Sequence, residues 1–187
     1  MIFSPVRKLF VLALFGALAS CGSPSGTMSH VSLSAGTSKQ SALSKQVFRE
    51  VNSYRASKGK SPLERHPGLD HLAKQHCDYL VKNGGKFSLH GSNVSHIGLQ
   101  GRGLIARQSY KIRSIGENVI SSHDHSAKRL VSLWAGSKGH EYNMSADWAC
   151  TGVATATTTD GRVISTQIFG VSPMENLGGR GDPFSQW

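Results

Sequence analysis

Two alternating segments near the end of the chain constrain its fold most. Residues 150–158 read C-T-G-V-A-T-A-T-T, and residues 162–170 read R-V-I-S-T-Q-I-F-G. Thr159, Asp160 and Gly161 lie between them, and Asp-Gly between two segments rich in Val, Ile and Thr is a strong hairpin signal. The sequence therefore predicts an antiparallel strand pair here, around which the other elements must pack.

Helical periodicity precedes this hairpin. A first apolar stripe ends before Gly59 and consists of Leu43, Val47, Phe48, Val51 and Tyr54. A second stripe runs from Pro67 to the Gly84-Gly85 pair and consists of Leu69, Leu72, Ala73, His76, Cys77, Leu80 and Val81. Ser126 can cap a third helix, whose apolar face is formed by Ala127, Leu130, Val131 and Trp134. Gly136 and Gly139 are expected to end that helix before His140.

The middle of the chain is less regular. Residues 86–113 are rich in Gly, Ser and polar side chains, and only 99–106 has the pattern of a short helix. Residues 115–120 read as a short extended element that carries Glu117. Because helices precede strands instead of alternating with them, the order predicts an α+β fold with an antiparallel sheet.

The N-terminus has the pattern of an export signal. Two basic residues precede an apolar run, residues 9–19, that is too short to span a bilayer stably. The following Leu-Ala-Ser-Cys matches the bacterial lipobox, which predicts removal of residues 1–20 and lipid attachment to Cys21. An ordinary secretory signal cleaved nearby is the alternative.

The predicted processing divides the chain into four parts. Residues 1–20 form the signal peptide, and residues 21–40 form a Ser-, Gly- and Thr-rich flexible linker. Residues 41–171 form the folded domain, and residues 172–187 form a C-terminal tail. The expected location is the bacterial cell envelope, where the lipid-anchored domain faces the periplasm or the exterior.

The charge of the chain favours contact with anionic surfaces. The formal net charge is +10, and it falls to +8 when residues 1–20 are removed. The basic residues are scattered, with no tight run and little interleaving with aromatic side chains. This pattern argues against a nucleic-acid partner for an exported protein.

Two cysteines remain once Cys21 carries lipid. Cys77 and Cys150 form an even pair in an exported domain, which favours one disulfide between them. The alternative is two buried thiols that behave as small apolar side chains.

Three ionisable residues are candidates for a shared cleft. Two imidazoles and a carboxylate, here His90, His140 and Glu117, can hold Zn or another divalent cation and leave a position open for water. The same groups could form a hydrogen-bonded polar cluster or an acid–base pair. His76 is expected to be a hydrogen-bonded core histidine, and His96 is expected to lie on the surface.

Five short motifs appear in a fixed order: F-S-L-H-G, G-E-N-V-I, W-A-G-S-K-G-H-E-Y-N-M, G-V-A and T-Q-I-F-G. Together they resemble the CAP superfamily (cysteine-rich secretory, antigen 5 and pathogenesis-related proteins, also called the SCP domain), and in particular its bacterial lipoprotein branch. The resemblance covers roughly residues 43–171. It implies an α-β-α sandwich with a central antiparallel sheet and a large open cleft.

The resemblance also implies roles for individual residues. Family members line the cleft with two His and two Glu, and some bind Zn or other divalent cations there. By position, His90, Glu117 and His140 match three of these groups. Ser137 stands where eukaryotic members have the second Glu, and this weakens the expectation of catalysis.

The remaining motif residues are expected to be structural. Trp134 should pack in the core between helix and sheet. Asn118 and Asn143 should satisfy backbone groups of turns, and Ser137 should cap the turn before His140.

These observations favour a non-enzymatic binding module on the cell envelope, with a lipid, a glycan or an envelope protein as its ligand. No Ser lies in a Gly-x-Ser-x-Gly elbow, and both remaining cysteines look structural. A metal-dependent, peptidase-like hydrolase and a purely structural envelope protein are the alternatives.

Overall fold

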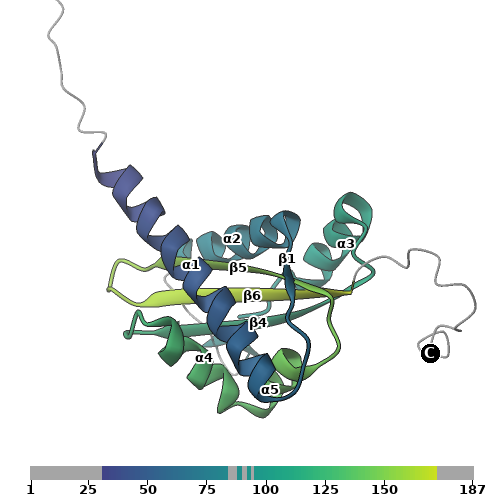
Figure 1. Cartoon of the computed structure of the whole chain (residues 1–187). Coiled ribbons are helices and arrows are strands. Elements are labelled where there is room, and N and C mark those ends of the chain that lie inside the picture. Colours follow the sequence, from purple (N-terminus) through teal and green to yellow (C-terminus); the bar gives the residue numbers. More distant parts are fainter. Residues whose placement is uncertain (1–30, 84–87, 90–91, 94, 172–187) are drawn as a thin grey trace, which may run out of the picture. The chain divides into compact units, whose positions relative to one another are not determined.

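A four-stranded sheet lies between two layers of helices (Figure 1). The computed structural model describes residues 31–83, 88–89, 92–93 and 95–171. The strand order is β1-β5-β6-β4, and the strands are β1 (Glu64–Arg65), β4 (Ser114–Ser122), β5 (Cys150–Thr157) and β6 (Val163–Val171). Two further strands, β2 (Ser88–Leu89) and β3 (Ser92–Asn93), form a separate two-stranded ribbon. No helix in this described part of the chain is long and apolar enough to cross a membrane.

The helices cover both faces of the sheet. Their bounds are α1 (Val31–Ser57), α2 (Pro67–Lys82), α3 (Leu99–Tyr110), α4 (Ala127–Ala135) and α5 (Lys138–Ser145). Helices α1 and α4 contribute to one apolar core cluster and helix α2 to another, and the described residues of the two clusters are entirely different. The expected α-β-α sandwich is confirmed.

Strand alternation separates the two clusters. In β5, Ala154 and Ala156 belong to the cluster under α2, whereas Val153 belongs to the cluster under α1. Successive side chains of a strand point to opposite faces, so one strand supplies both cores. The hairpin predicted from the sequence is present, because β5 and β6 pair antiparallel and Gly161 has a φ of +83° in the turn.

The sheet is mixed, which the sequence did not predict. Strand β1 adds to it parallel to β5, while the β4–β6 and β5–β6 pairs are antiparallel. A strand of two residues has no readable alternation. Residues 64–65 are recognised as a strand because they pair with β5.

Helix α2 approaches the sheet very closely at Gly152. A Cβ atom there would lie 2.1 Å from the backbone nitrogen of Asp70. The Asp70 carboxylate accepts a hydrogen bond from the Val153 backbone N–H at 2.8 Å. Glycine at position 152 therefore allows the first turn of α2 to dock directly on β5.

Two helix boundaries differ from the sequence prediction. Helix α1 begins at Val31, whereas ordered structure was expected from Ser41. Helix α4 ends at Ala135, before His140, as expected, but a further helix, α5, begins at Lys138, where no helix was expected. Buried Arg55 of α1 donates to the Met144 and Ala146 carbonyl oxygens at the end of α5, where a helix leaves its carbonyl groups without intrahelical partners.

The predicted disulfide is not formed. Cys77 and Cys150 are both free and buried. The Cys77 sulfur lies 3.4 Å from the carbonyl oxygen of Ala154, which is four residues along β5 from Cys150. Four residues of strand span about 13 Å, which exceeds the reach of a disulfide. Cys21, the predicted signal peptide and the predicted tail lie outside the described residues.

Candidate functional site

The Gly-Glu-Asn motif lies on β4, the edge strand that pairs only with β6 in the described sheet. Its three residues have three different roles because alternate side chains leave opposite faces. A Cβ at Gly116 would lie 2.8 Å from the ring of Trp148, so this position requires a small residue. Asn118 donates from Nδ2 to the His140 carbonyl oxygen at 3.0 Å. Glu117 therefore points to the other face, toward α2 and α3.

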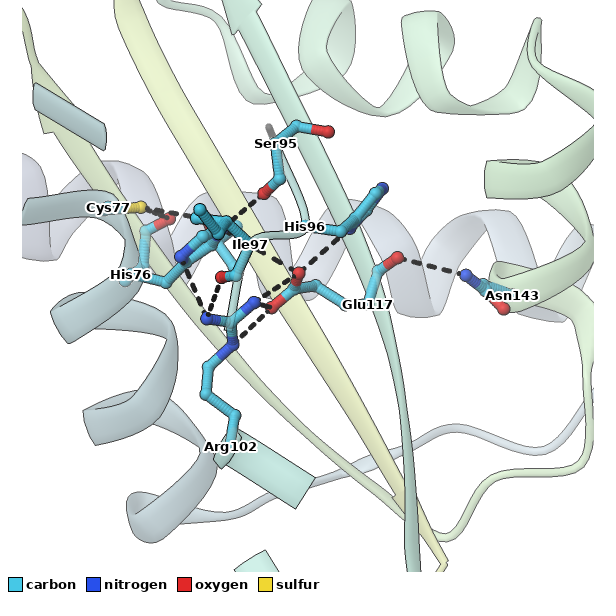
Figure 2. A network of polar contacts seen from close by, with 10 residues as sticks. His76, Cys77, Ser95, His96, Ile97, Arg102, Glu117 and Asn143 are labelled. Carbon is cyan, nitrogen blue, oxygen red and sulfur yellow. Dashed lines mark hydrogen bonds and ion pairs between the residues drawn. The ribbon is translucent and has the colours of Figure 1, made fainter. Parts of the chain in front are cut away.

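The Glu117 carboxylate is buried and held by two side chains (Figure 2). Arg102 of α3 donates from Nε to Oε2 and from Nη2 to Oε1, each at 2.7 Å. His96 donates from Nδ1 to Oε1 at 2.9 Å. A planar guanidinium that binds both oxygens of one carboxylate forms a strong and directional ion pair. The carboxylate is thereby fixed in position and neutralised.

His76 on α2 completes this group. Its Nε2 hydrogen-bonds the Ser95 carbonyl, so Nε2 carries the proton and Nδ1 can accept from Nη1 of Arg102 at 3.1 Å. Its ring is buried, and burial lowers the pKa of His76, which keeps the imidazole neutral. The sequence prediction of a hydrogen-bonded core histidine is confirmed. We call His76, His96, Arg102 and Glu117 the Glu117 cluster.

Two opposing effects set the protonation of Glu117. Burial by itself would raise the pKa of its carboxyl, because it penalises the charged form. The hydrogen bond from His96 and the charge and hydrogen bonds of Arg102 outweigh burial, so the pKa lies below its ordinary value. Glu117 is therefore an ionised carboxylate at neutral pH, and its charge is balanced by that of Arg102 in a buried ion pair.

The three residues predicted to share the cleft are not all found together in the described structure. His90 lies outside the described residues. Glu117 stands at the centre of the cluster. His140 lies on α5, and among the described residues no hydrogen bond or ion pair joins it to Glu117. Its Nδ1 is buried without a hydrogen-bond partner in that part of the chain, and burial, followed by the charge of His96, lowers its pKa.

His96 was expected on the surface, and it is only partly exposed. Its side chain is 31% exposed and binds the Glu117 carboxylate. Arg102 was not singled out at all, although it donates to both Glu117 oxygens. Both residues lie in the segment without sustained periodicity, where spacing gives no register. An Arg on the short helix at 99–106 was the only signal available there.

The structural motif residues connect β4 to α5. Asn143 donates from Nδ2 to the Glu117 carbonyl oxygen at 3.2 Å and to Oδ1 of Asn118 at 2.9 Å. These bonds join elements distant in the sequence, whereas bonds within turns were expected. Trp134 is fully buried, as predicted. Ser137 occupies the N-cap position of α5, but its side chain makes no capping hydrogen bond to the described helix, so that expectation was wrong.

Asn143 also lines a groove of about 1220 Å³. The first residues of β4, from Ser114 to Gly116, line it together with α5 and the segment up to Trp148. Tyr142, 70% exposed, also lines it. Trp148 stacks on Phe169 and donates from Nε1 to the Asn143 carbonyl oxygen at 2.8 Å, so this wall is well fixed. We call this surface the β4–α5 groove.

The model of the CAP family (cysteine-rich secretory protein family) matches residues 48–169. This match covers more than half of the chain and contains helices α2 to α5, strand β4 and its Gly-Glu-Asn motif. The chain belongs to the CAP family. Among curated proteins, none matches the sequence.

Solved structures share the fold of this CAP domain. An outer surface protein from Borrelia burgdorferi is 22% identical with a TM-score of 0.56, and the match covers 70% of this chain and 93% of that one. An extracellular protein with an SCP domain from Bacillus anthracis is 19% identical, with a TM-score of 0.57 and coverage of 76% and 44%. A cysteine-rich secretory protein from Staphylococcus aureus is 17% identical, with a TM-score of 0.53 and coverage of 70% and 38%. This chain thus spans less than half of the last two proteins.

The described side chains are poorly suited to bind the metal ion that the family resemblance implies. A divalent ion at Glu117 needs a carboxylate oxygen with a free lone pair and neutral imidazoles aimed at the same point. Both Glu117 oxygens already bind the Arg102 guanidinium, so a divalent ion there would meet a fixed positive charge, and both ring nitrogens of His76 are engaged. Within the described ranges, no group of three or more His, Cys, Asp or Glu side chains is arranged to hold a metal ion.

Proposed function

We propose that this CAP domain is a non-enzymatic binding module of the bacterial cell envelope, and that the β4–α5 groove is its ligand site. The observation that carries the proposal is the combination of a large open groove with a mostly exposed aromatic ring, Tyr142, on its wall. Exposed aromatic side chains beside a concave surface are typical of binding sites.

The chemistry of the described side chains supports binding over catalysis. Cys77 is a poor nucleophile, because burial raises the pKa of its thiol to about 12. Burial raises the pKa of Cys150 as well. Glu117 accepts hydrogen bonds on both oxygens, so it is poorly placed to take a proton from a substrate.

Three independent observations support the location. The CAP relatives with solved structures include an outer surface protein and an extracellular protein. The lipobox ending at Cys21 provides a route to the membrane, and the net charge favours an anionic surface. We therefore assign the domain to the outside of the cytoplasmic membrane, anchored by lipid on Cys21.

A retention assay tests the ligand site. Full-length protein is incubated separately with vesicles of envelope lipids, purified cell-wall glycan and envelope proteins from the same bacterium. We expect retention by one of these classes and about a tenfold weaker affinity for Tyr142→Ala, the loss typical of a contributing aromatic. Tyr79→Ala is the matched control, because Tyr79 is 44% exposed on α2 and does not line the groove. Equal retention of Tyr142→Ala and the parent protein would refute the groove as the site.

Membrane fractionation tests the anchor. Cys21→Ser should move the protein from the membrane fraction to the soluble exported fraction, because one diacylated residue supplies the attachment. The Cys150→Ser variant is the control, since Cys150 is buried in the folded domain. Retention of Cys21→Ser in the membrane would show that lipid on Cys21 is not the anchor.

One observation favours the alternative, a metal-dependent hydrolase. The buried Nδ1 of His140 has no hydrogen-bond partner among the described residues, so it is available as a ligand or base. That function requires metal uptake that is lost in both His140→Ala and His90→Ala. If the purified protein takes up metal in this way and hydrolyses a peptide substrate, the binding-module assignment fails.

A further inference from the structure

The guanidinium of Arg102 makes a complete set of contacts. Its Nε and Nη2 donate to the two Glu117 oxygens at 2.7 Å. Its Nη1 donates to the Ile97 carbonyl oxygen at 2.9 Å and lies 3.1 Å from Nδ1 of His76. A guanidinium has five N–H groups, and these contacts occupy every nitrogen. The side chains of Arg102 and Glu117 are 10% and 0% exposed, so the pair is almost fully removed from water.

The acceptors around Arg102 are the kinds of atom that bind metal ions. A carboxylate, a neutral imidazole nitrogen and a backbone carbonyl oxygen converge on the guanidinium (Figure 2). Two of these three types, carboxylate oxygen and imidazole nitrogen, are standard Zn ligands. They come from β4, α2 and the turn before α3, so the fold itself brings them to one point. At that point the protein supplies its own cation.

A second cation cannot share this point at low cost. A divalent ion bound to either Glu117 oxygen would lie within a few ångströms of a fixed guanidinium, because both oxygens bind Arg102 at 2.7 Å. Like charges repel strongly at that separation in a buried setting, where water screens them poorly. Displacing Arg102 instead would leave its charge unpaired in the protein interior, which is also costly.

We propose that Arg102 occupies the cation position of the Glu117 cluster, so that this CAP domain is closed to divalent metal at Glu117 and becomes a metal site when the guanidinium is removed. The fold determines where a cation is held, and residue 102 alone determines whether that cation is a guanidinium or a metal ion. In this chain the cluster stabilises the docking of β4, α2 and α3, and the metal that the family resemblance implies is replaced by a side chain.

Zinc titration of purified full-length protein tests this. Wild type, Arg102→Ala, Glu117→Gln and the double variant Arg102→Ala/Glu117→Gln are each melted with and without zinc chloride. We expect zinc at roughly 100 times its dissociation constant to raise the Tm of Arg102→Ala by about 5–10 °C. We expect wild type to show no zinc effect beyond that of Glu117→Gln, and the double variant to lose the gain.

The controls separate this site from zinc bound elsewhere. Histidines such as His123 and His125 can take up zinc at the surface. That uptake persists in Glu117→Gln, so the Tm shift of Glu117→Gln with zinc is subtracted from that of each other variant. Arg107→Ala removes an exposed positive charge from the same helix and should respond like wild type. A matched isothermal titration should show at least tenfold tighter zinc binding to Arg102→Ala than to wild type.

Three results would overturn the proposal. The first is zinc stabilisation of wild type that Glu117→Gln abolishes. The second is a folded Arg102→Ala protein that zinc does not stabilise. If Arg102→Ala does not fold without metal, Arg102→Ser is measured as well, and the third is failure of zinc to fold or stabilise either variant.

Discussion

The Glu117 cluster and the β4–α5 groove lie on two sides of the same strand and differ in burial, charge and hydrogen bonding. At the centre of the cluster, Arg102 and Glu117 form a buried ion pair whose nitrogen and oxygen atoms are hydrogen-bonded within the protein. The groove is open and presents the exposed ring of Tyr142. A ligand gains free energy where a protein has left groups unsatisfied or apolar surface in water. The more polar of the two regions is therefore the structural one.

Asn143 connects the two regions. Its side chain binds the Glu117 backbone and Asn118, and its carbonyl accepts from Trp148 on the groove wall. A change in one region can reach the other through such contacts. Substitutions in each region therefore show whether the two are separate or coupled.

The largest effect is expected from Arg102→Ala. Removing one partner of a buried ion pair leaves the other charge uncompensated, which costs about 3–5 kcal/mol. Urea unfolding should show this loss, and Arg102→Ala/Glu117→Gln should recover more than half of it because it removes both charges. Arg107→Ala, an exposed change on the same helix, should stay within about 0.5 kcal/mol of wild type. A small loss for Arg102→Ala would mean that water or another cation reaches Glu117.

An intermediate effect is expected from Asn143→Ala. It leaves the Glu117 carbonyl oxygen and the Asn118 side-chain oxygen without their donor, at about 1–3 kcal/mol. Because Asn143 also borders the groove, ligand retention should weaken together with stability. Gln108→Ala on the exposed side of α3 is the comparison variant. If Asn143→Ala lowers stability and leaves retention intact, the two regions are independent.

Acid should lower the free energy of unfolding in two ranges of pH. The pKa of Glu117 lies below its ordinary value of 4.5, so its contribution to folding is present above that pH and is lost as the pH falls through the lowered pKa. The pKa values of His76 and His140 also lie below their ordinary 6.5, so their contributions decline as the pH falls below 6.5. Unfolding midpoints measured across this range should therefore fall with decreasing pH.

The Glu117→Gln variant shows how much of the loss of stability below pH 4.5 comes from Glu117. It should reduce the decline below pH 4.5, to which Glu141 and Asp160 also contribute because their pKa values are lowered, and it should keep the histidine-dependent decline. An unchanged acid profile in Glu117→Gln would show that Glu117 is not the group responsible.

The smallest effect on stability is expected from Tyr142→Ala. The ring is 70% exposed, so its removal should change the free energy of unfolding by about 0.5 kcal/mol or less. The same variant should lose more ligand retention than Arg102→Ala or Asn143→Ala does. Parallel measurement of unfolding and retention checks this, and a strongly destabilised Tyr142→Ala would make the groove part of the core.

Much of the fold could be predicted from the sequence because its signals are local. Apolar spacing placed α2 and α4, the Asp-Gly turn placed the β5–β6 hairpin, and five ordered motifs indicated the family. Strand β1 and the helix α5 could not be predicted this way. Two residues of strand carry no pattern, and the carbonyl groups at the end of α5 are hydrogen-bonded by Arg55, which comes from α1.

The candidate site was predicted only in part. Glu117 could be singled out because Gly-Glu-Asn is a recognisable motif. Its partners His96 and Arg102 lie 21 and 15 residues upstream, and their approach depends on how α3 packs beside β4. No periodicity relates such positions, so they were missed.

The predicted disulfide shows the same limit of sequence-based prediction. An even pair in an exported domain was consistent with a bridge, and compartment and count are properties of the sequence. Whether two sulfur atoms come within reach depends on the register of α2 on β5, which places Cys77 beside Ala154. The separation of the two thiols was therefore decided by packing.

The sequence by itself determined the family, the layered architecture and the predicted route to the cell envelope, because these follow from local patterns and ordered motifs. Only the tertiary structure decided which charge faces Glu117. A buried carboxylate must be neutralised by whatever cation the packing brings within hydrogen-bonding distance. In this chain the packing of α3 against β4 brings Arg102, and that single contact separates a closed structural cluster from a site open to metal.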